Sequence, residues 1–186
     1  IMANAYQYIK ESLRNSLKSN MIEWRAGNSV VKIDKPTDIG RARALGYKDK
    51  KGFIAARVKV VRGGRQRPRP RKGRRSKRMT VRLTLKMNYQ WVAEQRAQKK
   101  FSNLEVLNSY KTGKDGKHYF YEVILVDPSK PEIISDRTIN WIVKGANRNR
   151  VYRGLTSAGK KSRGLRRKGP ELKVRPSARA WERRGR

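Results

Sequence analysis

The segment Gly154–Lys160, GLTSAGK, has the glycine and lysine spacing of a loop that binds nucleotide phosphates. In such a loop, a Ser or Thr after the lysine holds Mg²⁺, and a buried hydrophobic strand leads into the first glycine. Here Lys161 follows the lysine, Ser162 comes one place too late, and residues 147–153 are mostly Asn and Arg. The sequence therefore argues against nucleotide hydrolysis. The glycines can still bring backbone N–H groups close to phosphates, and RNA phosphates serve as well as nucleotide ones.

Acid–base and metal chemistry have few candidate residues in this chain. The single histidine, His118, is predicted at the mouth of a hairpin, where a surface or cross-strand role is commonest. The absence of cysteine excludes disulfides, thiolate nucleophiles and metal sites built from His and Cys. Glu94 has basic neighbours at helical spacing and is predicted to pair with them, and the solvent faces of strands are predicted to carry Glu105, Glu122 and Asp127. We predict no catalytic or metal-binding residue, no cofactor and no small-molecule substrate.

The charge of the chain is concentrated in two segments. The 186 residues carry a formal net charge of +35. Residues 62–86, called here the basic insertion, contain twelve Lys or Arg and no Asp or Glu, and residues 144–186 contain sixteen basic and two acidic side chains. Residues 87–143 contain eight basic and seven acidic side chains, and residues 1–61 contain thirteen basic and five acidic side chains. Self-repulsion on this scale opposes compaction, and a dense phosphate array would relieve it, which favours nucleic acid as the partner.

A membrane is the weaker alternative as a partner. No apolar stretch approaches the roughly 20 residues that span a bilayer, and no N-terminal hydrophobic segment with a cleavage site is visible. We therefore expect no membrane association. The absence of cysteine is compatible with a cytosolic location.

Arginine dominates the basic insertion, which begins RGGRQRPRPRKGRRSKR. A guanidinium group bridges phosphate oxygens with two hydrogen bonds and stacks on bases, whereas merely solvated tails are usually lysine-rich. Two prolines keep the backbone extended, which suits a path between the helices of a folded RNA. Residues that could stack on unpaired bases, each equally explained as a packing residue, are Tyr47, Tyr152 and Trp181.

The predicted RNA-binding residues belong to three groups. A helix before the first strand contributes Arg41 and Arg43, and Lys48 follows it. The basic insertion contributes Arg62, Arg65, Arg67, Arg69, Arg71, Lys72, Arg74, Arg75, Lys77 and Arg78. The C-terminal part contributes Arg153, Gly154, Gly159, Lys160, Lys161, Arg163, Arg166 and Arg167, with the glycines allowing close backbone approach.

The hydrophobic pattern predicts an α+β fold with a mainly antiparallel sheet flanked by helices and with long irregular basic extensions. Strands are predicted at 53–61, 104–110 and 119–126, the last two forming a hairpin and the last apolar on both faces and hence central. A first helix starts after Asn4, with a turn predicted between Asn20 and Gly27. Further helices are predicted at about 34–46, with a thin apolar side that packs against something other than its own core, and from near Asn88 to Lys100.

We predict one α+β domain over residues 1–144, with N-terminal helices and the basic insertion inside it. Residues 145–186, called here the basic tail, are predicted to be irregular and ordered mainly by a partner. The insertion leaves a strand at Gly63 and Gly64 and enters a helix near Asn88, so the fold holds both of its ends. That favours a defined path through one folded RNA. Both 62–78 and 145–186 are expected to be protease-sensitive without RNA and protected on it.

Several segments carry a resemblance beyond composition, namely residues 5–9, 43–48, 60–64, 92–97, 104–110 (LEVLNSY), 122–128 (EVILVDP) and 153–165 (RGLTSAGKKSRGL). In this order, from Ala5 to about Arg167, they resemble the archaeal and eukaryotic large-subunit ribosomal protein family L-fifteen-e. The absence of the longer histidine-rich eukaryotic C-terminus makes the chain look like an archaeal member. The resemblance implies an α+β fold and a structural, non-enzymatic role on cytoplasmic ribosomes. It also implies binding to 23S-type large-subunit rRNA, by extensions matching 62–78 and 153–167, and to neighbouring large-subunit proteins.

Two other functions stay open on the residues alone. A chromosomal DNA-coating protein would use the same charge, although no helix-turn-helix with base-reading side chains is evident, which favours RNA. An RNA-dependent enzyme would use the loop at Gly154–Lys160 and would bind nucleotide in the presence of Mg²⁺.

Overall fold

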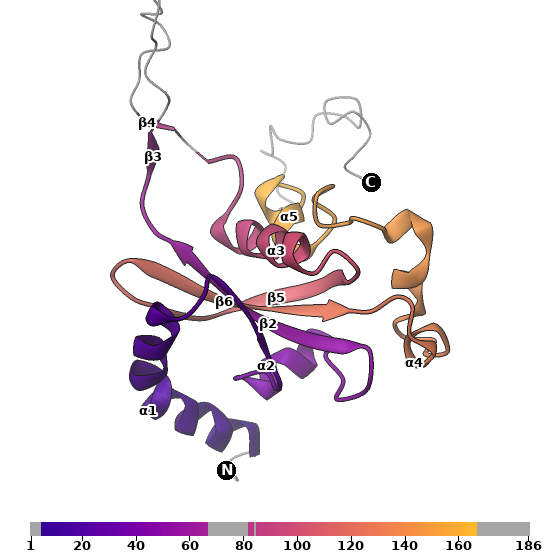
Figure 1. The fold of residues 1–186 in the computed structure, drawn as a ribbon, viewed down its shortest axis with the longest axis horizontal. Helices are drawn as coiled ribbons and strands as arrows, with labels where there is room; N and C mark the ends of the chain where they lie inside the picture. Colours follow the sequence, from indigo (N-terminus) through magenta and orange to yellow (C-terminus); the bar gives the residue numbers. More distant parts are fainter. Residues whose placement is uncertain (1–4, 67–81, 84, 167–186) are drawn as a thin grey trace, which may run out of the picture.

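A four-stranded antiparallel sheet forms the centre of the protein, shown as a computed structural model in Figure 1. The structure describes residues 5–66, 82–83 and 85–166. In sheet order the strands are β1 (Val30–Ile33), β2 (Phe53–Val61), β6 (His118–Val126) and β5 (Glu105–Lys114). Each pairs antiparallel with its neighbour. The predicted α+β class with a mainly antiparallel sheet is confirmed.

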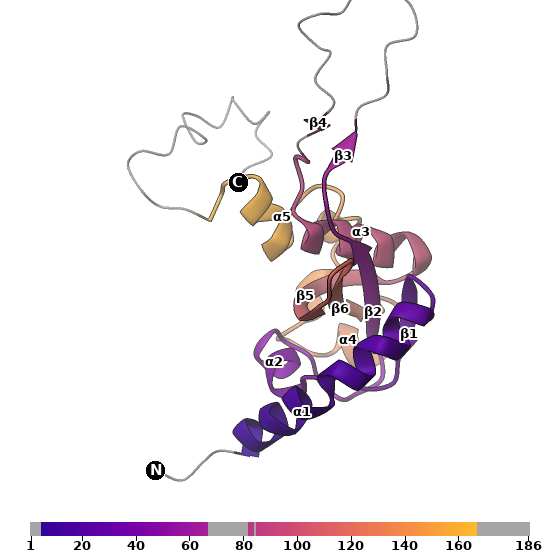
Figure 2. The same cartoon turned by 90° about the vertical axis from the view of Figure 1, so that its left-hand side faces the viewer.

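Helices cover both faces of this sheet. α3 (Tyr89–Lys100) lies on one face with α5 (Ser157–Ser162) beside it, and α1 (Ala5–Ala26) and α2 (Ile39–Ala44) lie on the other (Figures 1 and 2). A two-stranded ladder beyond the end of β2 pairs β3 (Arg65–Gln66) with β4 (Arg82–Leu83). The short elements after β6 are α4 (Pro131–Ile134) and the 3-10 helices η2 (Asn140–Val143) and η3 (Gly145–Asn147).

The central strand β6 is buried on both faces, as its sequence predicts. On the α3 side, Val123 and Leu125 belong to the main core cluster with Ala93 and Ala97 of α3. The small alanine side chains let the helix backbone approach the sheet closely. Alternate residues of the strand predicted at 53–61 complete this layer from β2, with Ile54, Ala56, Val58 and Val60 in the same cluster.

The opposite face of β6 packs against α1 and α2. Phe120 meets Trp24 of α1 edge to face, with ring centroids 5.5 Å apart. Ile124 clusters with Ala42 of α2, which is fully buried. The prediction that the helix at 34–46 packs against something other than its own core is therefore wrong. Ile39 and Leu45 pack against the same cluster, so even a thin apolar side is enough to hold this short helix on the sheet.

The predicted turn between Asn20 and Gly27 is also wrong, because α1 continues through it to Ala26. Tertiary packing outweighs the weak preference of Asn against helix: Met21 lies against Gly113 of the hairpin, and Trp24 is only 7% exposed. β1 was not predicted, since four residues at a sheet edge give too short a pattern to recognise.

Side-chain caps start two helices, α3 at the predicted place and α2 later than the start predicted at about residue 34. The side chain of Asn88 accepts a 2.7 Å hydrogen bond from the N–H of Trp91 and starts α3 where the sequence places it. α2 starts after Asp38, which accepts from the N–H of Arg41 at 2.9 Å. The chain leaves α2 through Gly46, whose φ of +99° is the left-handed conformation expected of a C-terminal stop.

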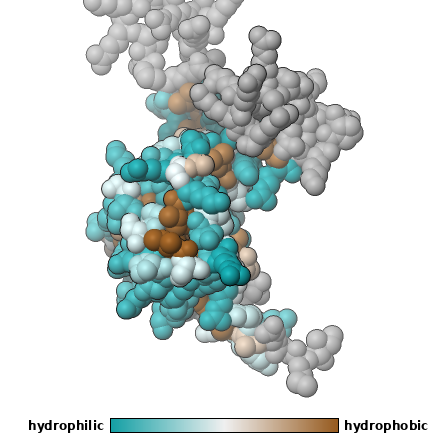
Figure 3. Space-filling model, turned by 90° about the vertical axis from the view of Figure 1, so that its right-hand side faces the viewer, coloured by the Kyte–Doolittle hydropathy of each residue, from teal (hydrophilic) through white to brown (hydrophobic). Residues whose placement is uncertain are grey.

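A third cluster lies where the chain leaves β6 and turns through α4 and η2. It buries Val126, Ile133, Ile139 and Ile142. Figure 3 views the molecule from the side that is on the right in Figure 1, and most of this surface is hydrophilic, with the most prominent hydrophobic group near its centre. The cluster closes the sheet at the end opposite to the basic insertion (Figure 1).

The first part of the basic tail packs on the domain. Val151 and Thr156 are fully buried and Ala158 is 3% exposed. α5 contacts α3 and β5. The boundary predicted at residue 144 stays a prediction, but the described part of the tail shares the core of the domain before it.

Candidate nucleic-acid interface

The basic insertion leaves and re-enters the domain as an antiparallel ladder. Arg65 of β3 pairs with Leu83 of β4, and Gln66 with Arg82. The ladder stands beyond the sheet on the α3 side (Figures 1 and 2). Within the insertion, eight of the predicted RNA-binding residues lie outside the described residues: Arg67, Arg69, Arg71, Lys72, Arg74, Arg75, Lys77 and Arg78.

Hydrogen bonds join the two ends of the insertion to each other and to α5. The hydroxyl of Tyr89 donates to the carbonyl of Gly63 at 2.6 Å, which ties the return of the chain to its exit. The N–H of Asn88 donates to Ser162 Oγ at 3.0 Å, and its side-chain amide donates to the carbonyl of Ala158, also at 3.0 Å. The described ends of the insertion and α5 are therefore brought together at one end of the molecule.

The exposed face of α5 carries cations that the fold does not use. Lys160 and Lys161 are exposed, and their ammonium groups have no hydrogen-bond or ion-pair partner among the described residues. Arg163 instead donates to the carbonyls of Arg153 and Gly154, both at 3.2 Å. Arg166 donates to Ser157 Oγ at 2.6 Å. Arg167 lies outside the described residues.

The two predicted phosphate-binding glycines contact each other. A Cβ on Gly159 would lie 2.7 Å from the Cα of Gly154, and Gly154 itself has a φ of +66°. Both residues are buried. The structure thus gives these glycines an internal role, the close packing of α5 on the loop before it, and their contact with RNA stays a prediction.

A buried carboxylate positions the start of α5. Glu94 of α3 is fully buried and accepts hydrogen bonds from Ser109 Oγ at 2.5 Å and Thr156 Oγ1 at 2.6 Å. The same Thr156 oxygen accepts from the N–H of Gly159 and caps α5. Burial raises the pKa of Glu94, against the opposing effect of the two hydroxyls and of Arg150.

The predicted solvent exposure of the strand glutamates is wrong, and so is the surface pairing predicted for Glu94. Glu105 is 6% exposed and Glu122 is 1% exposed. Glu105 accepts from the N–H of Asn149 at 2.8 Å. Glu122 accepts hydrogen bonds from the N–H of Thr37 at 3.0 Å and from the hydroxyl of Tyr110. Burial, together with the nearby Glu122 carboxylate, raises the pKa of Tyr110. Periodicity alone cannot separate a solvent face from one that is covered by a helix or loop.

The third predicted group lies away from α5 and the insertion. α2, which carries Arg41 and Arg43, is on the opposite face of the sheet (Figure 2). Arg41 donates to the carbonyl of Lys111 at 3.2 Å, and Arg43 donates to the Tyr6 hydroxyl at 3.0 Å. Lys48 pairs with Asp136 at 2.7 Å.

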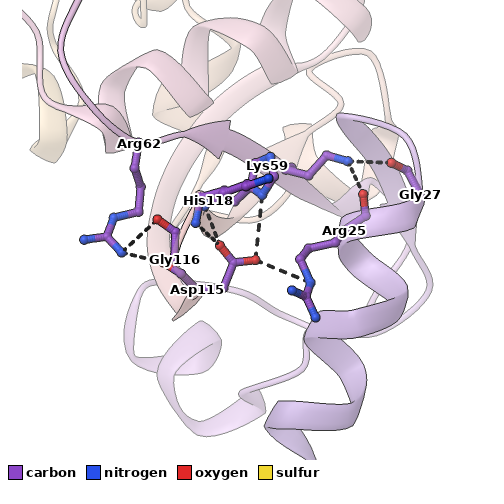
Figure 4. A network of polar contacts seen from close by, with 8 residues as sticks. Arg25, Gly27, Lys59, Arg62, Asp115, Gly116 and His118 are labelled. Carbon is purple, nitrogen blue, oxygen red and sulfur yellow. Dashed lines mark hydrogen bonds and ion pairs between the residues drawn. The ribbon is translucent and has the colours of Figure 1, made fainter.

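Arg62 is half-buried and supports the hairpin between β5 and β6 (Figure 4). Its guanidinium donates to the carbonyl of Asp115 at 2.5 Å and stacks on Tyr119, 4.9 Å from the ring centroid. Asp115 in turn faces Arg25 of α1 at 3.6 Å and His118 Nδ1 at 3.7 Å. His118 pairs across the sheet with Val61, so the predicted cross-strand role is confirmed. These contacts direct the chain into the insertion.

Several residues that arrange this interface were not predicted. Arg150 is 9% exposed and donates to the carbonyls of Val106 and Leu107 at 2.6 and 2.9 Å. Burial lowers the pKa of Arg150, and the negative charges of Glu94 and Glu105 oppose this effect. Neither the pairing of Asn88 with α5 nor its capping of α3 was predicted, although a helix was predicted to begin near it. An arginine or asparagine of this kind gives no sequence signal that separates an internal role from an RNA contact.

The three aromatic candidates separate by burial. Tyr47 is 6% exposed and packs edge to face on Phe53, so it is a packing residue. Tyr152 is 48% exposed. Trp181 lies outside the described residues.

The described part of the chain offers neither a membrane-spanning helix nor a cluster of metal ligands. Among its helices, none is long and apolar enough to cross a membrane. Within the same residues, no group of three or more His, Cys, Asp or Glu side chains is placed to hold a metal ion.

Comparison with known proteins gives a consistent result. Residues 2–181 match the family model described as "Ribosomal L15", the L-fifteen-e type. The match therefore extends beyond residue 167, where the resemblance in the sequence weakens. One similar curated protein is the "Large ribosomal subunit protein eL15" of the archaeon Methanocella arvoryzae, 52% identical over 195 aligned residues that cover 100% of both chains.

Proposed function

The chain belongs to the L-fifteen-e family of ribosomal proteins, and from that premise we propose that it is a structural constituent of the large ribosomal subunit that binds and stabilises folded rRNA. The basic insertion and the α5 end of the molecule form the principal RNA contact. Its partners are 23S-type large-subunit rRNA and neighbouring large-subunit proteins, and it acts on the ribosome in the cytoplasm. It has no enzymatic activity in this role.

One observation supports the proposal above the others: hydrogen bonds from Asn88 hold the base of the insertion against α5. The two most basic segments, which the balanced segment 87–143 separates in sequence, thereby meet on one end of the molecule. Phosphate contacts from both segments can then engage one folded RNA at fixed spacing, and phosphate contacts are what position a protein on nucleic acid.

Sedimentation of a cell lysate tests the subunit assignment. In a sucrose gradient containing magnesium, the protein is expected to sediment with large subunits. Its presence only in the light fractions would contradict the proposal.

A chromosomal DNA-coating protein is the second candidate, because the same charge serves duplex DNA. Competition at fixed salt separates the two candidates, since salt dependence alone is steep for both. We expect transcribed large-subunit rRNA fragments to displace duplex DNA of equal phosphate content. Equal competition by the two nucleic acids would favour the DNA-coating role.

A further inference from the structure

Tyr152 is an exposed aromatic residue in the most basic described part of the chain. Its side chain is 48% exposed, and it makes no ring contact with the described residues. Between residues 137 and 170 the sequence contains eleven Lys or Arg and no Asp or Glu. An isolated exposed aromatic is common on protein surfaces, so the case for a ligand depends on how the backbone holds this ring and on what surrounds it.

Contacts with the core hold the chain just before Tyr152. The N–H of Asn149 is bound by Glu105, and the guanidinium of Arg150 is bound by two carbonyls of β5 and lies 5.0 Å from the ring centroid of Trp141. The carbonyl of Val151 accepts from the indole N–H of Trp91 at 2.7 Å. The three residues before Tyr152 are thus each tied to the core. Because the backbone is already held, only the side-chain torsions of the ring have to be ordered when it binds.

The surroundings of the ring are cationic. Arg148 and Arg153 are exposed, and the Arg153 guanidinium is held over the loop by the carbonyls of Ala146 and Arg148. The contact between Gly154 and Gly159 places the start of α5 against this loop, and α5 carries the unpaired Lys160 and Lys161. Phosphates would therefore be attracted to the region that presents the ring.

We propose that Tyr152 is a stacking platform for an unpaired base of the bound RNA, an inference that rests on the proposed function. Cations alone would hold the RNA backbone anywhere along this surface, whereas an aromatic ring on a held backbone can hold one nucleotide in register. Every base offers a π face to such a ring, and single-stranded or extruded bases are what proteins stack in folded RNA. An acidic protein partner would pair with the cations, but it would offer no base for the ring to stack on.

Binding of the full chain to transcribed archaeal large-subunit rRNA, measured at several salt concentrations, tests the proposal. Tyr152→Leu keeps apolar bulk but loses the π face, and we expect its affinity to fall by about 5- to 150-fold with no change in salt slope. Tyr152→Phe keeps the ring and is expected to bind within twofold of the unmodified chain. The charge control, Lys161→Gln, is expected to reduce the salt slope.

Three results would overturn the stacking role: Tyr152→Leu binding within twofold of the unmodified chain, a loss accompanied by a reduced salt slope, or an equal loss in Tyr152→Phe. Ultraviolet crosslinking of the unmodified complex needs no variant. A nucleotide adduct on Tyr152 is expected by mass spectrometry, and its absence while other residues are crosslinked also contradicts the proposal. If the unmodified chain shows no salt-dependent RNA binding at all, the proposed function itself fails.

Discussion

Basic side chains in this protein differ by what already surrounds their charge. Arg150 is buried on two backbone carbonyls, and Lys48 pairs with Asp136. Lys160 and Lys161 have no such partner among the described residues. A cation that is already neutralised within the fold gains less from a phosphate, because binding must first break or share its existing contact. Fewer basic side chains are therefore free to contact RNA than the sequence contains.

Replacing Lys161 by Gln is expected to weaken rRNA binding and to lower the steepness of log affinity against log salt by about one unit, the value of one phosphate contact. Lys48→Gln is the matched control, because its ammonium group already meets a carboxylate at 2.7 Å. Lys48→Gln is expected to change the slope of log affinity against log salt less than Lys161→Gln does. Filter binding between about 50 and 200 mM salt measures both. Equal slope losses would show that Lys48 contacts RNA as the sequence predicts.

Glu94 makes stability depend on pH. Burial raises its pKa above the ordinary value of 4.5, so the folded chain holds the proton more tightly than the unfolded chain. The protonated Glu94 therefore stabilises the folded chain as the pH falls toward about 4.5, and this stabilisation is lost as the pH rises through the pKa of the folded state. Each pKa unit between the folded and unfolded states corresponds to about 1.4 kcal/mol in the free energy of unfolding.

Glu94→Gln lacks this titration. Urea unfolding of both chains between pH 4.5 and 8 should show the free-energy difference moving in favour of the unmodified chain as the pH falls. A difference that is constant, or that moves in the opposite direction, would argue against a raised pKa at Glu94.

At the scale of elements, α5 is positioned by contacts that its own sequence does not predict. Ser157–Ser162 has no apolar stripe, and it is held by the Thr156 cap, by the close approach of Gly159 to Gly154, and by Asn88 of the neighbouring helix start. Three short contacts take the place of a hydrophobic face. We therefore expect α5 to be sensitive to the loss of any one of them.

Gly159→Ala tests this dependence. In an isolated helix alanine is favoured over glycine by about 1 kcal/mol. Here the new Cβ would lie 2.7 Å from the Cα and 2.8 Å from the carbonyl carbon of Gly154, and backbone atoms cannot move away cheaply. We expect a net loss of about 1–3 kcal/mol in the free energy of unfolding, as for overpacked cores, and weaker rRNA binding because α5 is displaced.

Gly145→Ala is the control for that substitution. No atom lies within 4 Å of its ideal Cβ, and its φ is not positive. Its stability should stay within about 0.5 kcal/mol of the unmodified chain. If Gly159→Ala is as stable as Gly145→Ala in urea, the close contact does not hold α5.

Elements with a long, regular apolar pattern could be predicted, and those without one could not. β2, β6 and α3 repeat apolar residues over nine or more positions, and their bounds agree closely with the prediction. β1 has four residues and α5 six, mostly polar, so nothing in their own sequence separates them from loops. Tertiary contacts decide them.

The candidate site was predictable as segments but not as an arrangement. The charge runs identify the insertion and the tail, since their composition has no other ready use. That the two segments meet depends on hydrogen bonds of Asn88 with Ala158 and Ser162, about 70 residues further along the chain. The burial of Glu105 and Glu122 follows from elements packed over the sheet, which alternation along one strand does not encode.

For the whole molecule, the net charge of +35 should oppose folding of the free chain. Added NaCl shortens the range of repulsion from about 30 Å at 0.01 M to about 10 Å at 0.1 M. We therefore expect the Tm of the free protein to rise with NaCl over this range, while its affinity for rRNA falls over the same range. Chloride is preferable to sulfate in this measurement, because excluded salts stabilise proteins regardless of their charge.

The two opposite responses to salt separate repulsion from binding. At low salt, rRNA fragments should raise the Tm by neutralising the same cations and by binding only the folded chain. At high salt, this gain should shrink as binding weakens and as ions already screen the repulsion. A Tm that falls with NaCl in the free protein would show that ion pairs, such as Lys48 and Lys50 with Asp136, contribute more to stability than the excess of positive charge removes.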